Sequence, residues 1–576
     1  MAYSFYLGSS GSEKTERAFL DMIEASLEAP EERFFVLVPE QYSMLVQKKL
    51  LALHPRHASR NLEALSLNRL AYRVFQERNV QLPPIMDESG KAMVVRRVGS
   101  LLEKELTLWK GKVKKAGFAE QVKSMISECL QYGAAPSRFA ELAATEKKRQ
   151  LSMKLRDFSL LYQGVRDFVQ GKQLPKEEIL GCFAGCIASS ELLRGAHILL
   201  VGFVGFTPVQ YRVLEELLAV AADVHFVVSL DTALNPYRQL PEEELFHLST
   251  EYIRRIGEIA DRVRVPHGED RIFPGAARLK APELAFLDAH ALRYDGAVYT
   301  GEVRALTVAA QESPEAEAAA LSRHILRLVK DEGYRYRDIA VVVADFQGLG
   351  EFFSEALLAA GIPAHLDENL TVRANPLPEL LNAALLCVRE NFSPRTFFRF
   401  LHNPLVTDQW KLTALLENYV TLTGVRHLKR LREPFSYCPK ELEGADLEAL
   451  NRFKEEMLNL LLPLREAFSE GEADVAVIAA LLEGLMEQLA VEEKLQHAAE
   501  RFLSAGEAPR AREFSEVYPE TQRILREMRE VLAGERLSRA DMAGVLESGL
   551  REIHIGQIPA YADRVTLGDL TRTRFL

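Results

Sequence analysis

Cysteine and long hydrophobic runs are both scarce in this sequence. Five cysteines are scattered over 576 residues, which excludes a disulfide framework. No apolar run approaches the roughly 18 to 20 residues that a membrane span needs, and the N-terminus lacks a basic flank followed by an apolar signal core. We therefore expect a cytoplasmic protein without a membrane anchor.

Metal-ligand patterns are also missing. Cys182 and Cys186 stand four residues apart in "GCFAGC", on one face of an expected helix, but no second ligand pair follows them. We expect both thiols to be packed against the core, and we expect no metal site in this chain.

Positive charge is not in excess, since the formal net charge is −11. This balance disfavours a uniformly basic nucleic-acid surface but leaves room for a local basic channel, because the field depends on where charges lie. The basic runs "LWKGKVKKAG" (108–117) and "RHLKRLR" (426–432) are either solvated faces or contacts to a nucleic-acid backbone.

Hydrophobic periodicity predicts an α/β chain whose two parallel-sheet parts are each interrupted by helices. Short apolar runs at "AYSFYL", "RFFVLV", "EALSL", "HILLV" and "DVHFVV" are typical of buried parallel strands. These runs give a first domain over 1–86 and 185–290, with a helical insertion over 87–184.

A second α/β domain is predicted over 291–388 and 550–576. It begins with an expected strand in "EVRALTVAA" (302–310), continues through "DIAVVVADF", and closes with a strand at Val565–Leu567. A second helical insertion fills 389–549. The layout resembles that of superfamily 1 helicases, which implies two RecA-like P-loop domains, each with a large all-helical insertion.

The stretch "YLGSSGSEKTERAF" (6–19) is spaced like a phosphate-binding loop with one substitution. Gly8, Gly11, Lys14 and Thr15 stand where a P-loop places them, between an expected strand and an expected helix. Glu13 replaces the glycine before the lysine and brings a negative charge close to any bound phosphate. The loop is therefore either a weak site for ATP and Mg²⁺ or a structural turn.

A hydrolytic motor also needs an Asp-Glu pair at the end of a second strand, to hold magnesium and to orient water. The matching strand continues into "VGFVGF", where Gly202 and Phe203 occupy the two positions. We expect no ATP turnover by this chain and assign no catalytic residue.

Eight collinear stretches resemble the motifs of the AddB (RexB) family, the B subunits of AddAB-type ATP-dependent helicase/deoxyribonucleases. They are "GSSGSEKT", "LVPEQYSMLVQKKL", "LSLNRLAYRVFQE", "LLVGFVGFTPVQYRVLEELL", "GYRYRDIAVVVADF", "GIPAHLDENL", "LENYVTLTGVR" and "IPAYADRVTLGDLTRTR". The resemblance covers essentially the whole chain.

The resemblance implies a helicase-like body with a degenerate motor, paired with an AddA-like helicase-nuclease subunit. Such complexes process double-strand breaks for recombinational repair, and the B subunit scans the 3′-ended strand for the Chi sequence. The resemblance also implies contacts to single-stranded DNA and duplex ends. The family's nuclease domain and iron–sulfur cluster would lie beyond Leu576, so we expect no cluster in this chain.

Loops after the predicted strands supply candidate DNA contacts. By resemblance we assign Chi or strand recognition to Gln41, Ser43, Arg69, Tyr72 and Phe206, since bases stack on aromatics and phosphates pair with arginine. Arg572 and Arg574 are further candidate phosphate contacts. For Tyr72 and Phe206 the alternative is core packing, and for Arg69 it is a plain surface charge.

Two other functions stay open at this point. The chain could be an ATP-hydrolysing superfamily 1 helicase in its own right, although "VGFVGF" argues against that interpretation. It could also be a purely structural subunit without a DNA site.

Overall fold

A computed structural model of the chain describes residues 2–113, 115, 117–290, 293, 295–366, 370–371, 375–437, 439–442, 446–555, 563–570 and 573. Contacts group the chain into two compact units. Unit 1 is Met1–Ile85, Ser124–Glu141 and Gln170–Val308, and unit 2 is Met86–Lys123, Leu142–Val169 and Ala309–Leu576. Cys438, Arg572 and Arg574 lie outside the described residues.

Unit 1 is built on a six-stranded sheet in the order β3-β2-β6-β7-β1-β8, in which every pairing is parallel. Five of its strands confirm the predicted parallel sheet, and β8 was not predicted. The strands are β1 (Ala2–Gly8), β2 (Phe34–Leu37), β3 (Leu62–Leu65), β6 (His197–Leu200), β7 (Asp223–Ser229) and β8 (Arg271–Phe273).

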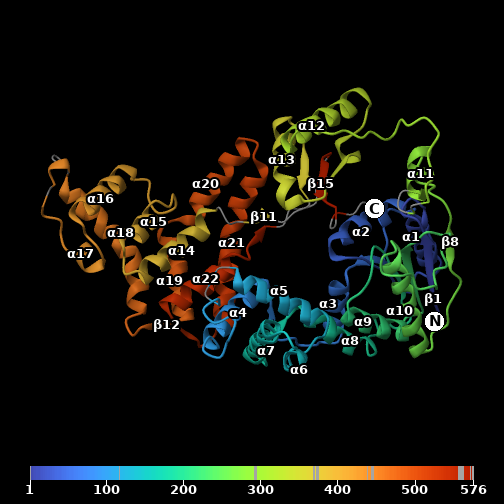
Figure 1. The fold of residues 1–576 in the computed structure, drawn as a ribbon, viewed down its shortest axis with the longest axis horizontal. Helices are drawn as coiled ribbons and strands as arrows, with labels where there is room; N and C mark the ends of the chain where they lie inside the picture. The colour runs from blue at the N-terminus through green and yellow to red at the C-terminus, as the bar shows by residue number, and fades with distance from the viewer. Residues whose placement is uncertain are drawn as a thin grey trace. The chain divides into compact units, whose positions relative to one another are not determined.

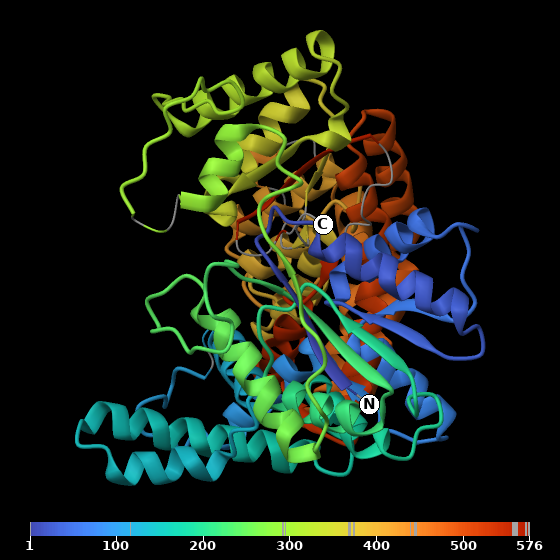
Figure 2. The same cartoon turned by 90° about the vertical axis from the view of Figure 1, so that its right-hand side faces the viewer.

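Helices cover both faces of this sheet (Figures 1 and 2). Tyr3, Phe5 and Leu7 alternate along β1 and enter one large apolar cluster with the helices of that face. The intervening side chains of β1 point to the other face. The helices are α1 (Lys14–Glu28), α2 (Ser43–Leu53), α3 (Leu67–Glu77), α8 (Ile179–Ile187), α9 (Pro208–Val220) and α10 (His247–Val263). Cys182 and Cys186, on α8, pack against the cluster as thiols.

The segment predicted as a helical insertion is helical over most of its length. It holds α4 (Glu88–Leu101), α5 (Phe118–Gln131), α6 (Pro136–Thr145) and α7 (Arg149–Val169), followed by α8. The two compact units cut across this segment, so the four-part division of the chain stays a prediction.

Unit 2 carries a smaller parallel sheet in the order β10-β15-β9. The strand predicted near the end of the sequence is confirmed, since β15 (Val565–Asp569) lies in the middle, between β9 (Ala340–Val343) and β10 (Ala364–Leu366). Helices α12 (Pro314–Asp331) and α13 (Phe346–Ala359) pack with these strands, and a small core cluster joins them.

The strand predicted at 302–310 is wrong, because this stretch adopts no strand. The buried Glu283 carboxylate accepts hydrogen bonds from the backbone N–H groups of Arg304, at 2.8 Å, and Ala305, at 2.6 Å. These donors are therefore unavailable to a sheet, and Val308 is 92% exposed. The alternating apolar residues of this stretch therefore do not pack against an apolar surface.

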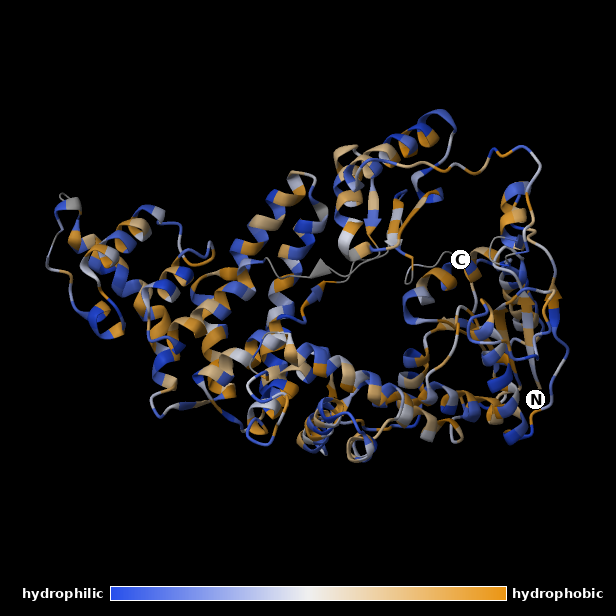
Figure 3. Ribbon diagram, viewed as in Figure 1, coloured by the Kyte–Doolittle hydropathy of each residue, from blue (hydrophilic) through white to orange (hydrophobic). Residues whose placement is uncertain are grey.

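The remainder of unit 2 is mostly helical, as predicted for 389–549. Two short antiparallel strand pairs interrupt it, β11 (Leu370–Thr371) with β14 (His554–Ile555) and β12 (Glu472–Asp474) with β13 (Arg536–Ser538). Polar side chains cap several helix starts, among them Asn375, Ser393, Asp446, Asp474 and Ser538. Apolar stripes alternate with polar stripes along the helices (Figure 3). The helices are α14 (Pro376–Arg389), α15 (Pro394–Leu401), α16 (Trp410–Thr423), α17 (Leu428–Arg432), α18 (Leu447–Ala467), α19 (Val475–Gln488), α20 (Val491–Ser504), α21 (Ala508–Val531) and α22 (Arg539–Leu550).

A polar joint ties the start of α4 to α21 within unit 2. Asp87 caps α4 by accepting from the backbone N–H groups of Ser89 and Gly90. Glu527 of α21 accepts from the Gly90 N–H at 3.1 Å. The Ser89 hydroxyl lies within hydrogen-bond distance of both carboxylates, and Arg523 pairs with both.

Among the described residues, no helix is long and apolar enough to cross a membrane.

Candidate phosphate-binding and DNA-binding edge of the six-stranded sheet

The carboxyl ends of the six parallel strands lie at one edge of the sheet, so the loops that follow them share that edge. The strand register pairs Gly8 at the end of β1 with Ser229 of β7. It also pairs Leu37 at the end of β2 with Leu65 of β3 and with Leu200 of β6. The predicted phosphate-binding loop leaves β1, while the predicted DNA contacts leave β2, β3 and β6.

The loop after β1 turns tightly around the carbonyl oxygen of Ser9. This oxygen accepts hydrogen bonds from Lys14 Nζ at 2.6 Å, from Ser12 Oγ at 2.8 Å and from the Ser12 N–H at 3.2 Å. Glu13 is exposed at the start of α1 and makes no side-chain cap, and Thr15 is half-buried in the first turn. The predicted strand, turn and helix are therefore present, and the lysine is bonded to its own loop.

Close backbone approach explains both glycines of the loop. A Cβ on Gly8 would lie 2.9 Å from the carbonyl oxygen of Phe273, and one on Gly11 would lie 3.0 Å from side-chain atoms of Ala276 and Leu279. The Arg278 N–H donates to the Gly11 carbonyl at 2.9 Å. A segment some 260 residues further along the chain thus lies against the loop.

Positive charge gathers beside this loop without close anionic partners. Lys14 is only 4% exposed, and burial, followed by the Arg278 guanidinium, lowers its pKa to about 8, while Asp288 acts in the opposite direction. Burial and Arg278 also lower the pKa of Lys49. No ion pair to Lys14 occurs among the residues that the structure describes, and the buried Ser9 hydroxyl lacks a partner there. An anion at this loop would relieve both deficits.

The loop that follows β6, residues 201–207, contains no acidic residue. Gly202 has φ +81°, a conformation that favours glycine over any residue with a side chain. The Phe203 ring packs 4.8 Å from that of Phe206. Across the described part of the chain, no group of three or more His, Cys, Asp or Glu side chains could hold a metal ion.

The loop after β2 presents one of its two predicted contacts. Gln41, in the 3₁₀ turn Glu40–Tyr42, is exposed, and its amide donates to the Tyr42 hydroxyl at 2.7 Å. Ser43 is 4% exposed, and its hydroxyl donates to the Glu40 carbonyl at 2.9 Å. Ser43 thus holds the turn, and Gln41 is the more accessible of the two predicted contacts.

The loop after β3 adjoins the loop after β2, since Asn68 Nδ2 donates to Glu40 at 3.4 Å. Arg69, in the first turn of α3, is exposed, and its guanidinium has no partner in the described part of the chain. Tyr72 lies one turn further along and is 45% exposed, with its ring edge-on to Phe75. We refer to Gln41, Arg69 and Tyr72 as the strand-binding patch, after the DNA single strand that they are predicted to contact.

Phe206 is less available than these three side chains. It is half-buried, and its ring meets those of Phe203, Tyr211 and Tyr252. Packing against the core, the alternative weighed from the sequence, therefore accounts for most of its surface. The following Thr207 caps α9 through a capping box with Gln210.

The sequence patterns did not single out some residues that lie at this edge of the sheet. Met44 and Leu45, at the start of α2, are 50% and 49% exposed, and an outward apolar pair in "SMLVQKKLLAL" could have drawn attention. Arg278 and Lys49 carry no such signal. Arg278 approaches Lys14 and Lys49 only through the tertiary fold.

The parallel six-stranded sheet and its covering helices make this chain an α/β protein. The turn after its first strand has the residue spacing of a phosphate-binding loop. The family model "ADDB, N-terminal" matches residues 5–288. The curated relatives include proteins named as the B subunit of an ATP-dependent helicase/deoxyribonuclease, from Lachnoclostridium phytofermentans, 32% identical, Moorella thermoacetica, 31%, and Pelotomaculum thermopropionicum, 29%.

These three alignments cover 100% of this chain and 51% of each relative. The chain belongs to the AddB family. It spans about half the length of the curated relatives it matches.

Proposed function

We propose that this chain is the helicase-like, motor-inactive body of the B subunit of an AddAB-type helicase-nuclease. It works with an AddA-like partner on DNA double-strand breaks in the cytoplasm, binds the 3′-ended single strand and scans it for Chi. The two parallel sheets correspond, in this proposal, to two RecA-like domains. The names of the relatives support a subunit role in such a complex.

The observation that carries the DNA-binding role is the strand-binding patch. Arg69 and Tyr72 stand one turn apart on α3 with exposed side chains, and Gln41 lies on the neighbouring loop. A guanidinium without an ion partner suits a phosphate, and an exposed phenol ring is a stacking surface for a base, worth about 1–3 kcal/mol per stacked base.

The absence of a motor rests on a different part of the same edge. An acid at position 202 would meet unfavourable backbone geometry, and the side chain at position 203 is engaged in aromatic packing. Lys14, Lys49 and Arg278 still favour a phosphate group. We therefore propose ATP with Mg²⁺ as a structural ligand of the loop after β1, bound without turnover.

Fluorescence anisotropy with a labelled single strand tests the DNA-binding role. We expect salt-dependent binding by the full chain, weakened roughly tenfold or more in the variant Arg69→Ala/Tyr72→Ala, because one phosphate contact and one stacking surface are lost. Arg73→Ala on the same helix is the matched control, since Arg73 is paired with Glu63. An affinity equal to wild type in the double variant would favour a purely structural subunit.

A further inference from the structure

A groove in unit 2 gathers three arginines from two adjacent helices. Arg389 ends α14, while Arg395 and Arg399 belong to α15, and α22 supplies the opposite wall. The groove has a volume of about 250 Å³, and its other polar lining groups are Asn382, Glu390 and Glu547. All three arginines are exposed at its rim, so a ligand could reach them from solvent.

The carboxylates around the groove do not balance these arginines. Arg399 makes a two-pronged ion pair with Glu379, at 2.6 and 2.9 Å, which fixes its guanidinium in place. Arg389 has only a 3.3 Å contact to the neighbouring Glu390. The Glu547 carboxylate is held by Arg551, at 2.8 Å. Arg395 has no ion pair or hydrogen bond to its side chain within the described ranges.

The position of Arg395 is electrostatically unfavourable in the free chain. It is the second residue of α15, where the unsatisfied backbone N–H groups create a partial positive charge. A cation there is opposed by the helix dipole, and no carboxylate within the described ranges compensates it. An anion in the groove would stabilise this arginine and the loosely held Arg389 together.

We propose that this groove binds a backbone phosphate of DNA, as a second, sequence-independent contact in addition to the strand-binding patch. The proposal rests on the DNA-binding role proposed above. Guanidinium groups match phosphate oxygens in two-pronged geometry, and three of them line this groove. Contacts to phosphate position a protein on DNA and carry no sequence information. The contact therefore adds affinity and leaves sequence preference unchanged.

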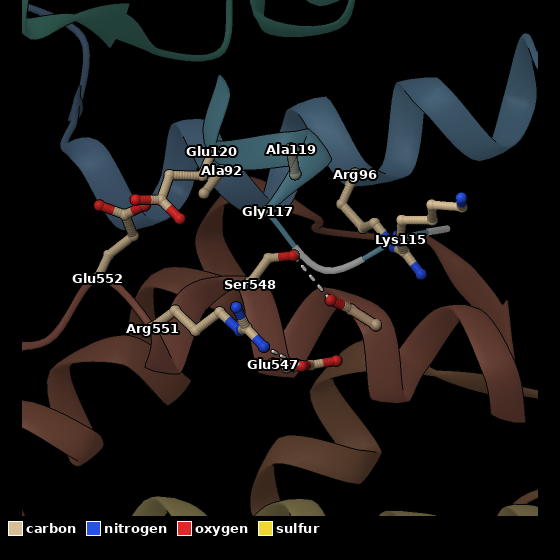
Figure 4. Close-up of a pocket in the computed structure, with 11 residues that line it drawn as sticks. Ala92, Arg96, Lys115, Gly117, Ala119, Glu120, Glu547, Ser548, Arg551 and Glu552 are labelled. Atoms are coloured by element: carbon tan, nitrogen blue, oxygen red, sulfur yellow. Dashed lines mark hydrogen bonds and ion pairs between the residues drawn. The ribbon is translucent and has the colours of Figure 1, made fainter. Parts of the chain in front are cut away.

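The neighbouring cavity on the other side of Glu547 has no such surplus. Apart from Lys115, whose side chain has no ion pair among the described residues, its charged and hydroxyl groups have partners. Arg551 faces Glu547, Ser548 Oγ donates to the Gly544 carbonyl, and Glu552 pairs with Lys123 (Figure 4). The Arg96 guanidinium donates to the Val113 carbonyl. The groove, with Arg395 unpaired in the described part of the chain and Arg389 loosely held, is therefore the better anion site of the two.

The test compares groove and patch variants of the full chain by anisotropy, with single-stranded and duplex probes at roughly 50 to 200 mM salt. Arg389→Gln/Arg395→Gln keeps the side-chain bulk and removes two charges. The matched control is Arg452→Gln, an exposed arginine of α18 that lies outside the groove and has no ion pair among the described residues. We expect the groove variant to lower the slope of log affinity against log salt by about 1 per arginine removed, equally for every sequence.

The outcomes separate this proposal from the proposed function. A groove variant with wild-type affinity and salt slope, while Arg69→Ala/Tyr72→Ala still weakens binding, overturns the groove and leaves the DNA-binding role standing. Wild-type chain that binds neither probe overturns both. An equal loss in the Arg452→Gln control would show that any exposed arginine contributes, which also overturns a defined groove.

Discussion

Replacing Glu527 with glutamine should flatten the pH dependence of unit 2 stability. In the joint between α4 and α21, the single hydroxyl proton of Ser89 faces two carboxylates, Asp87 at 2.5 Å and Glu527. Two ionised carboxylates at that distance repel each other, so the folded chain retains a proton. Burial and the Asp87 carboxylate raise the pKa of Glu527 to about 8, and the pKa of Asp87 falls to about 2 through its hydrogen bonds and Arg523.

The direction and size of this change in stability with pH follow from the number of protons bound in the folded and unfolded chain. A raised folded-state pKa means that the contribution of Glu527 is fully present below its unfolded value of 4.5 and is lost as pH rises through about 8. In this window the folded pair holds one proton more than the unfolded pair, which gives a limiting slope of about 1.4 kcal/mol per pH unit. Because the Asp87 side chain is 39% exposed, solvent screening reduces the effect, and we expect about 2 kcal/mol between pH 6 and pH 8.

Tryptophan fluorescence isolates this effect. The two tryptophans, Trp109 and Trp410, both belong to unit 2, and Trp109 is 8% exposed. Urea unfolding at pH 6, 7 and 8 should show wild-type stability falling, while Glu527→Gln stays level because its amide cannot ionise. Glu520→Gln is the matched control, since Glu520 pairs with Arg523 but does not bond Ser89 or Asp87. Parallel profiles for wild type and Glu527→Gln would refute the shared proton.

Three further outcomes are expected in unit 1. Saturating MgATP should stabilise the folded unit, by about 2.7 kcal/mol at a hundredfold excess over Kd, and should therefore raise its thermal midpoint. Lys14→Ala should abolish that shift. An unshifted midpoint in the wild type would contradict a nucleotide ligand. Gly202→Asp should destabilise by about 1–3 kcal/mol because of its positive φ, measured by thermal melting; an unchanged midpoint would show that the turn tolerates an acid. His197 is hydrogen-bonded to Asp223 and Glu32, which raise its pKa, so its stabilisation is present below pH 6.5 and lost as pH rises through the raised value. The thermal midpoint should therefore fall more steeply with rising pH in wild type than in His197→Gln, and parallel profiles would count against this role.

The parallel sheet was predictable because its strands are continuous apolar runs. Those of β2 and β6 are buried on both faces, which is what "FFVL" and "ILL" indicate. The edge strand β8 has two exposed residues out of three and lacks such a run. The expected strand at 302–310 has the right residues, but the N–H groups of Arg304 and Ala305 donate to Glu283. This contact spans about twenty residues and leaves no local sign in the sequence.

The placement of the candidate residues was predictable where they directly follow a strand. Gly8, Gly11, Lys14 and Thr15 form the expected turn, and Arg69 and Tyr72 emerge at the same edge. The burial of Ser43 and the approach of Arg278 to Lys14 follow from tertiary packing, which local pattern does not encode. The arginine groove is also tertiary, because its walls come from helices about 150 residues apart.

ATP hydrolysis by the purified full chain, measured with and without saturating single-stranded DNA, tests the central claim most directly. We predict that the chain binds the strand with a salt-dependent affinity and releases no phosphate above background in either condition. Phosphate release that is stimulated by the strand and abolished by Lys14→Ala would contradict a motor-inactive body and would make the chain a helicase motor in its own right.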